Sequence, residues 1–220
     1  MGAPGTAAPS VSSFLLRAPG PVRLGTLPRV GEALGRAILG QLVQGLEAAI
    51  STAQVAAAVG TPARGGLWCW PTARQIGGAQ HPTLRRCGIS GRAVRALHAG
   101  AVEDRRLEAA RSDLGHLDAR LRQLPGVGVW TSAETRLALG DPDAVSVGDY
   151  HLPSVVGTAL TGEQRPRAAW TDVEMVELLE PFAGQRGRII RLCERAAARR
   201  LVSRPARRAP RAALSAHRYW

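Results

Sequence analysis

An aspartate that follows a loop of glycine and proline has the clearest chemical potential in this sequence. Asp149 stands in the run Val-Gly-Asp-Tyr-His-Leu at residues 147–152, after the loop Gly-Asp-Pro-Asp at residues 140–143. We expect Asp149 to open a helix, where aspartate commonly caps the first backbone amides. An ionised carboxylate can equally stabilise positive charge developing on a substrate, or orient and deprotonate an attacking water. The residues alone leave both roles open.

A glycine-rich turn precedes this carboxylate, in the run Leu-Pro-Gly-Val-Gly-Val-Trp-Thr at residues 124–131. Gly126 and Gly128 allow positive φ and close approach of another backbone. The turn leads into a helix, whose first amides have no partner within the helix and form a site for a DNA phosphate together with the helix dipole. The predicted DNA contacts are therefore Gly126, Gly128, Val129 and Thr131. A plain corner between two helices remains the alternative.

The basic residues of the chain are all arginine. The 220 residues hold 29 arginines and no lysine against 17 acidic residues, a net charge of +12. Of this charge, +10 lies from Arg186 onward, where Glu194 is the only acidic residue. Such a charge favours a polyanionic partner, with a solvated basic surface as the alternative. Arginines at 188, 191, 195 and 199 predict one basic helical stripe.

Apolar periodicity predicts an all-α chain without a run of alternating strands. The longest predicted helix covers residues 32–59, with Leu34, Ile38 and Leu42 on its apolar face and a stop at Gly60. A loop is predicted at residues 68–72. Shorter helices are predicted over residues 72–78, 82–88, 90–100, 103–110, 116–123, 149–160, 171–180 and 183–201.

The composition also sets the expected domains and excludes several classes of protein. We expect a poorly ordered segment over residues 1–30, a helical domain over residues 31–202 and a basic tail over residues 203–220. The three cysteines have no metal-ligand spacing, which argues against structural zinc, an iron–sulfur cluster and a disulfide framework. No membrane-spanning run or signal peptide is recognisable. We therefore expect a cytoplasmic protein without a cofactor.

The run from residue 124 to residue 152 resembles the signature of the helix-hairpin-helix (HhH-GPD) DNA glycosylases, a hairpin followed by a Gly/Pro-rich loop and an aspartate. Residues 36–43, Arg-Ala-Ile-Leu-Gly-Gln-Leu-Val, resemble the signature helix of 3-methyladenine DNA glycosylase II, the AlkA type. Weaker matches lie at residues 70–72, 84–89 and 181–192. The resemblance spans residues 32–201 and implies a two-lobed helical fold. Too few residues precede the signature helix for the N-terminal β-rich domain of many AlkA-type proteins, so we expect that domain to be lacking.

The same resemblance assigns roles in turning a nucleotide out of the duplex. Asp149 falls on the catalytic aspartate, and Asp141 and Asp143 lie too early in the motif and are expected to be loop residues. Leu42 falls on the apolar wedge that enters the minor groove, with Gln41 beside it. Because Leu42 also lies on the predicted apolar stripe, a core position is the alternative.

Further residues are assigned to the base pocket and the hairpin. Trp130 is expected to line the base pocket and stack on a cationic base, or to pack in the core. Glu134 stands where AlkA-type proteins often carry an aromatic, which leaves base specificity open. His151 is expected either to contact DNA or to be structural. The resemblance also implies that the backbone carbonyls of Leu124 and Val127 hold a monovalent cation.

Related lyases form a Schiff base with a lysine just after the hairpin. Here Val129 and Trp130 occupy that neighbourhood, and the chain has no lysine. We therefore predict a monomeric, monofunctional enzyme, associated with the bacterial nucleoid, that excises alkylated purines from double-stranded DNA in base excision repair. A glycosylase for another lesion, and a non-catalytic or weakly active DNA-binding module, are the alternatives.

Overall fold

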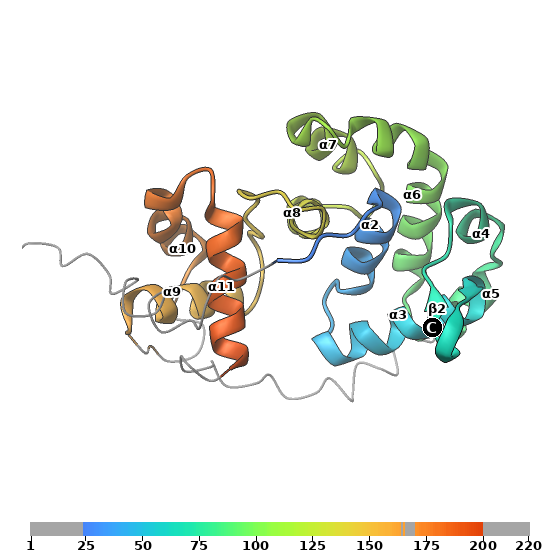
Figure 1. The fold of residues 1–220 in the computed structure, drawn as a ribbon, viewed down its shortest axis with the longest axis horizontal. Coiled ribbons are helices and arrows are strands. Elements are labelled where there is room, and N and C mark those ends of the chain that lie inside the picture. The colour runs from blue at the N-terminus through green and yellow to red at the C-terminus, as the bar shows by residue number, and fades with distance from the viewer. Residues whose placement is uncertain (1–23, 164, 166–169, 200–220) are drawn as a thin grey trace, which may run out of the picture. The chain divides into compact units, whose positions relative to one another are not determined.

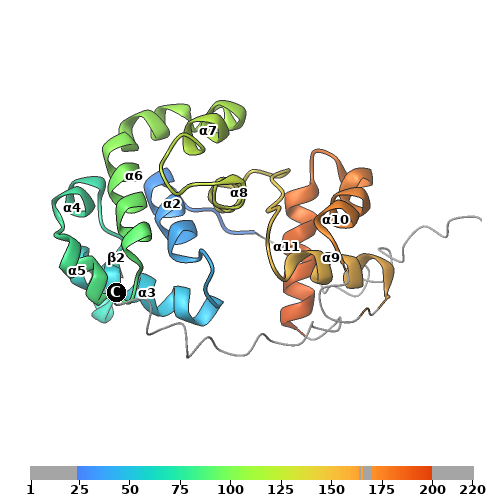
Figure 2. The same ribbon diagram turned by 180° about the vertical axis from the view of Figure 1, so that it is seen from behind.

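The computed structural model describes residues 24–163, 165 and 170–199 and divides them into two compact helical units (Figures 1 and 2). We call Thr26–Asp141 the hairpin unit, and the described residues from Pro142 to 199 the aspartate unit. Residues 1–23 and 200–220 lie outside the described residues. The predicted basic tail and most of the predicted N-terminal segment therefore fall outside them.

The hairpin unit is built almost entirely from helices. Its elements are α2 (Val30–Leu39), α3 (Gly45–Val59), β1 (Thr61–Pro62), η1 (Arg64–Gly66), β2 (Trp68–Cys69), α4 (Ala73–Gly78), α5 (His81–Arg86), α6 (Gly91–Ala110), α7 (Leu114–Leu121) and α8 (Val129–Ala138). The two short strands pair antiparallel, with Pro62 opposite Trp68. The all-α fold class is thus confirmed.

Helix α2 forms the centre of the hairpin unit, where it packs between α6 and α8 (Figures 1 and 2). Its side chains Val30, Leu34 and Ile38 are fully buried. Close approach to α6 depends on Gly100, because a Cβ there would lie 2.9 Å from Leu34 Cδ2. The core therefore fixes the end of α2, from which the chain continues toward Gln41 and Leu42.

The aspartate unit contains α9 (Leu152–Thr161), α10 (Asp172–Leu179), η2 (Glu180–Phe182) and α11 (Arg186–Ala198). Its core is formed by Leu152, Val156, Leu160, Met175, Leu179, Ile190 and Cys193. The indole of Trp170 lies against Gly157 of α9, where a Cβ would come within 2.3 Å of the ring. The guanidinium of Arg165 stacks 3.7 Å from the centre of the same ring.

A carboxylate from the loop that precedes α9 caps the start of α11. Asp143 Oδ1 accepts hydrogen bonds from the backbone amide of Arg186 at 3.0 Å and from its Nε at 2.9 Å. Asp143 Oδ2 also pairs with the guanidinium of Arg186. These bonds hold the pKa of Asp143 below its usual value. Asp143, expected to be a loop residue, therefore also caps a helix that begins far along the chain. Asp141, the other expected loop residue, is buried and forms an ion pair of 2.5 Å with Arg136.

Three local predictions were wrong. The single helix predicted over residues 32–59 ends at Leu39 and restarts at Gly45, where Gln44 and Glu47 form a capping box. The two helices predicted over residues 90–100 and 103–110 are one helix, α6, in which Gly100 packs closely against Leu34. The predicted loop at residues 68–72 begins with strand β2. Among the described residues, no helix is long and apolar enough to cross a membrane.

Candidate active site

The predicted hairpin joins α7 to α8 through a tight turn. The amide of Val127 donates a hydrogen bond of 3.1 Å to the carbonyl of Leu124, which closes the turn. Pro125 occupies the second position and Gly126, with φ +83°, the third. This is the arrangement of a type II turn, in which the third position requires positive φ. Leu124 and Val127 are buried and anchor the turn to the core.

The first turn of α8 follows directly after this hairpin. Gly128 is the N-cap residue, and its carbonyl accepts the amide of Ser132 at 2.9 Å. No described side chain caps this end of the helix. Gly128 and Val129 are exposed, so that solvent or a ligand can reach the start of α8. The first amides of a helix lack partners within it and can bind an anion.

Gln41 ties the segment after α2 to this hairpin. Its side-chain Nε2 donates two hydrogen bonds of 2.8 Å, to the carbonyl of Gly126 and to Oγ1 of Thr131. The side chain of Thr131 is buried, so its hydroxyl is bonded within the protein and does not face solvent. Two residues predicted to contact DNA, Gln41 and Thr131, therefore direct these side-chain groups toward each other. Only the backbone of Thr131 is left for the predicted DNA contact.

Leu42 is an exposed apolar residue in a left-handed backbone conformation. Its φ is +57° and 83% of the residue is accessible. The alternative that Leu42 belongs to the core is therefore wrong, because α2 ends before this position. A large apolar side chain held out into solvent suits insertion into DNA, and that role stays a prediction. Leu46 and Ile50 of α3 are also exposed.

Trp130 lies over the end of α2. A Cβ on Gly40 would lie 3.3 Å from the indole ring of Trp130, so the ring contacts the backbone there. Both Trp130 and Glu134, one turn later on α8, are half-buried. Packing and partial exposure thus coexist for Trp130, and stacking on a base stays a prediction.

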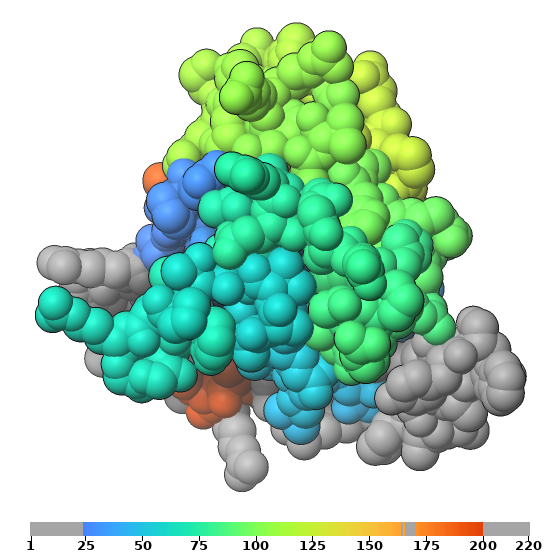
Figure 3. Space-filling view, turned by 90° about the vertical axis from the view of Figure 1, so that its right-hand side faces the viewer, coloured from blue at the N-terminus to red at the C-terminus, as the bar shows by residue number. Residues whose placement is uncertain are grey.

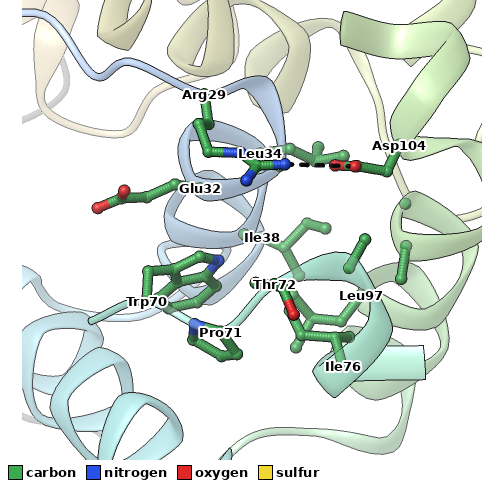
Figure 4. A pocket seen from close by; sticks show the side chains of 15 residues that line it. Arg29, Glu32, Leu34, Ile38, Trp70, Pro71, Thr72, Ile76, Leu97 and Asp104 are labelled. Carbon is green, nitrogen blue, oxygen red and sulfur yellow. Dashed lines mark ion pairs between the residues drawn. The ribbon is translucent and has the colours of Figure 1, made fainter. Parts of the chain in front are cut away.

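A small cavity of the hairpin unit lies apart from these residues, between α2, α4 and α6 (Figure 4). Trp70 and Ile76 line it, and the ion pair between Arg29 and Asp104, 3.6 Å long, crosses one side. Its volume of about 60 Å³ is far below the size of ordinary ligand pockets. We therefore do not regard it as a base pocket.

The predicted catalytic carboxylate lies just before α9 in the aspartate unit. Asp149 is half-buried, and its Oδ1 accepts hydrogen bonds from the amides of His151 at 2.8 Å and Leu152 at 2.9 Å. Asp149 thus caps these amides, but the prediction that it opens the helix is wrong, because α9 begins at Leu152 with His151 as its N-cap residue. The exposed His151 ring packs edge-on against Tyr150, with 4.8 Å between ring centres. Its contact with DNA stays a prediction.

A second carboxylate holds the loop that carries Asp149. Gly148 has φ +88°, and its amide donates a 3.1 Å hydrogen bond to Oδ2 of Asp172 at the start of α10. Among the described residues, Oδ1 of Asp172 is buried without a hydrogen-bond partner. Sequence reasoning missed Asp172 and the bonds of Gln41, because both connect residues far apart in the chain.

The predicted cation ligands belong to the same turn. The carbonyl of Leu124 already accepts the amide of Val127, but a carbonyl oxygen has a second lone pair. The carbonyl of Val127 accepts no hydrogen bond from the described residues. Both oxygens thus have capacity for a monovalent cation, and its binding stays a prediction. No side-chain cluster able to hold a metal ion occurs within residues 24–163, 165 and 170–199.

The described helices have the fold of helix-hairpin-helix DNA glycosylases. The structure resembles a 3-methyladenine DNA glycosylase from Archaeoglobus fulgidus with a TM-score of 0.72 and 21% identity, covering 85% of this chain and 65% of that one. A 3-methyladenine DNA glycosylase from Schizosaccharomyces pombe, solved with abasic DNA, gives a TM-score of 0.68 and 19% identity, covering 86% and 89%.

A third solved structure is an 8-oxoguanine glycosylase/lyase from Clostridium acetobutylicum, bound to double-stranded DNA with cytosine opposite the lesion. Its TM-score is 0.67 at 13% identity, and the match covers 87% of this chain and 66% of that one. This chain thus spans less than two thirds of the Archaeoglobus and Clostridium chains. No family model and no curated protein matches the sequence.

Proposed function

We propose that this protein is a monofunctional DNA glycosylase that excises alkylated purines, such as 3-methyladenine, from double-stranded DNA. The observation that carries the proposal is the likeness of its fold to glycosylases named for 3-methyladenine, over 85% or more of the chain. Asp149 at the start of α9 adds the carboxylate that such chemistry requires.

In this proposal, the hairpin grips the DNA backbone and Leu42 replaces the base that leaves the stack. The exposed start of α8 binds a phosphate without reading sequence. Extrusion of a nucleotide costs a few kcal/mol of unstacking. An apolar wedge lowers that cost by filling the gap, as other wedge residues do when they separate base steps. The high exposure of Leu42 supports this role.

The proposed reaction breaks the bond between C1′ of the sugar and the purine nitrogen. The bonding electrons leave with the base, and positive charge develops on the sugar as in glycoside hydrolysis. The carboxylate of Asp149 stabilises that charge and orients the water that attacks C1′, and it accepts the proton that this water loses. An alkylated purine carries a positive charge and leaves as a neutral base, so no general acid is required. Stacking on Trp130 favours the same cationic base.

The product of this reaction is a free base and an intact strand with an abasic site. A Schiff-base step through lysine has no candidate residue, because none of the 220 residues is lysine. We therefore expect the strand to break only after treatment with hot alkali. Scission by the pure protein without alkali would contradict the monofunctional assignment.

A glycosylase for another lesion is the second candidate. Glu134 on α8 is half-buried one turn after Trp130, so its carboxylate can change which base is accepted. The fold likeness also extends to an 8-oxoguanine glycosylase/lyase.

The experiment that tests the proposal is base release from duplexes carrying single lesions. The panel contains 3-methyladenine or a stable analogue, 7-methylguanine, hypoxanthine, uracil and 8-oxoguanine, with undamaged DNA as the control. Release of methylated purines by the wild type supports the proposal, and release of another base alone supports the second candidate. Tight DNA binding without release from any duplex would identify a non-catalytic DNA-binding module.

A further inference from the structure

Three arginines gather where α5 ends and α6 begins, next to the hairpin. Arg85 belongs to α5, and Arg92 and Arg95 belong to the first turns of α6. Figure 3 looks onto the face of the hairpin unit that carries α4, α5 and α6. We call these three residues the arginine patch. No motif in the sequence analysis included them as a group.

Arg92 connects the arginine patch to the hairpin. A Cβ on Gly126 would lie 3.8 Å from Nε of Arg92 and 3.4 Å from the Cβ of Ala96. The turn of the hairpin therefore rests on α6 at the position where Arg92 projects. Because residues three apart share a helix face, Arg92 and the exposed Arg95 continue along the same side.

Two guanidinium groups converge over Gly91. A Cβ on this glycine would lie 3.3 Å from Nη1 of Arg85 and 3.8 Å from Nη1 of Arg95. The start of α6 adds the positive end of a 20-residue helix at the same place.

No acidic side chain neutralises the exposed members of the patch. Within the described residues, Arg92 and Arg95 form no ion pair and no side-chain hydrogen bond. Farther along the same helix, Arg106 is paired with Glu103 at 2.9 Å. The charges of Arg92 and Arg95 beside the hairpin are thus left for a partner outside the described residues.

We propose that the arginine patch binds phosphates of the DNA strand next to the phosphate held by the hairpin. The inference rests on the proposed function, because it requires DNA at the start of α8. Arginine suits this contact, since its planar guanidinium donates paired hydrogen bonds to phosphate oxygens. The patch thereby extends the grip of the hairpin along the duplex without adding sequence preference.

The test measures how the affinity for a duplex with an abasic-site analogue depends on salt. Each phosphate contact contributes about −0.9 to the slope of log K against log salt concentration. The double variant Arg92→Gln/Arg95→Gln is expected to make the slope less steep by about 1.8 and to weaken binding most at low salt. Arg92→Lys/Arg95→Lys keeps both charges and is expected to retain most of the wild-type slope.

Arg74→Gln/Arg105→Gln is the matched control. It removes the same charge from exposed residues of the hairpin unit, and Arg105 lies about 20 Å along α6 from Arg92. This control is expected to leave the slope nearly unchanged. Melting temperatures close to that of the wild type are expected for all variants, because exposed substitutions usually change stability by less than about 0.5 kcal/mol.

Two outcomes would contradict phosphate binding by the arginine patch. One is a wild-type slope in Arg92→Gln/Arg95→Gln, and the other is an equal loss of slope in the control. If the wild type releases damaged bases but the patch variant keeps its slope, the patch is wrong and the proposed function stands. If the slope changes as expected but no base is released, the patch stands and the proposed function is wrong.

Discussion

Asp149 combines a structural and a proposed chemical task in one carboxylate. Its Oδ1 caps α9 through two backbone amides, those of His151 and Leu152. A carboxylate held in this way has a fixed orientation, which a site that stabilises charge on C1′ requires. Asp149 can therefore cap the helix and act in catalysis at the same time. A substitution is needed to distinguish the two roles.

Asp149→Asn separates the two tasks, because asparagine caps helices about as well as aspartate but carries no charge. We expect base release to fall by about 10²-fold or more, while the melting temperature stays near the wild-type value. Asp149→Ala is expected to lose both the activity and about 1 kcal/mol of unfolding free energy. Single-turnover base release and thermal unfolding measure the two effects. Wild-type activity in Asp149→Asn would leave only the capping role.

Leu42 permits a second test at a single residue. Because it is 83% accessible, Leu42→Ala is expected to change the unfolding free energy by less than about 0.5 kcal/mol. The loss of the wedge is expected to slow base release by about 10-fold or more, since unstacking costs a few kcal/mol. Fluorescence of 2-aminopurine opposite or next to the lesion reports the flipping step. Leu46→Ala, which truncates a leucine that is 73% accessible, is the control, and an equal effect in both variants would contradict a wedge specific to Leu42.

For single residues, the sequence predicts the candidate catalytic and DNA-binding residues better than it predicts the residues that hold them in place. The hairpin glycines and Asp149 are recognisable because the motif is short and local. The partners of Gln41 lie 85 and 90 residues away, and Asp172 lies 24 residues from Gly148. No local pattern encodes such pairs, since they arise only when helices pack.

Among the elements, the connection between α2 and the hairpin links two segments with proposed DNA contacts. Gln41 donates to Gly126 within the turn and to Thr131 in the first turn of α8. Because Leu42 follows directly, these bonds fix the position of the exposed leucine relative to the start of α8. We expect this link to matter for DNA binding as well as for stability.

The link is tested by a double-mutant cycle between Gln41→Ala and Thr131→Val. Thr131→Val removes the hydroxyl acceptor at nearly constant volume and is expected to cost about 1–2 kcal/mol of unfolding free energy. The coupling energy between the two sites is expected to be about 0.5–1.5 kcal/mol. Thr131→Ser keeps the hydroxyl and is expected to retain both the coupling and the affinity for abasic DNA. Additive effects in the cycle would show that the two side chains do not interact.

Element boundaries were predicted less well than element types. Leu34, Ile38 and Leu42 keep helical spacing through residues 32–59, although the helix stops after Leu39. Periodicity cannot detect a break between two helices when the apolar residues on both sides of it keep the same helical spacing. The start signal at Gln44 and Glu47 was present in the sequence, as was a glycine at residue 40. Conversely, the break predicted between residues 100 and 103 is absent, because α6 continues through Gly100, which packs against Leu34.

For the whole molecule, charge is distributed unequally between segments. Most of the net charge of +12 lies from Arg186 onward, partly in α11 and partly outside the described residues. Arg188 and Arg195 of α11 and its C-cap residue Arg199 are exposed. Arg191 pairs with Glu194 at 2.8 Å. The predicted basic stripe is thus present as an exposed face, and its contact with phosphate stays a prediction.

The stability of the aspartate unit is expected to depend on pH through two carboxylates. Hydrogen bonds from the Thr171 amide and Arg165 lower the pKa of Glu174 to about 2. The bonds from Arg186 lower the pKa of Asp143. The unfolded values lie near 4, so the unfolded chain binds more protons between these limits. The stabilisation is therefore complete above about pH 5 and is lost as the pH falls through the folded pKa values.

Amide hydrogen exchange of α10 and α11 between pH 5 and pH 2, corrected for intrinsic rates, measures this loss. Protection is expected to fall with pH in the wild type, and Glu174→Gln and Asp143→Asn are expected to flatten the dependence for α10 and α11 respectively. Glu177→Gln is the control, because the side chain of Glu177 is exposed and makes no hydrogen bond or ion pair with the described residues. A wild-type pH dependence in both test variants would mean that other groups control acid unfolding of this unit.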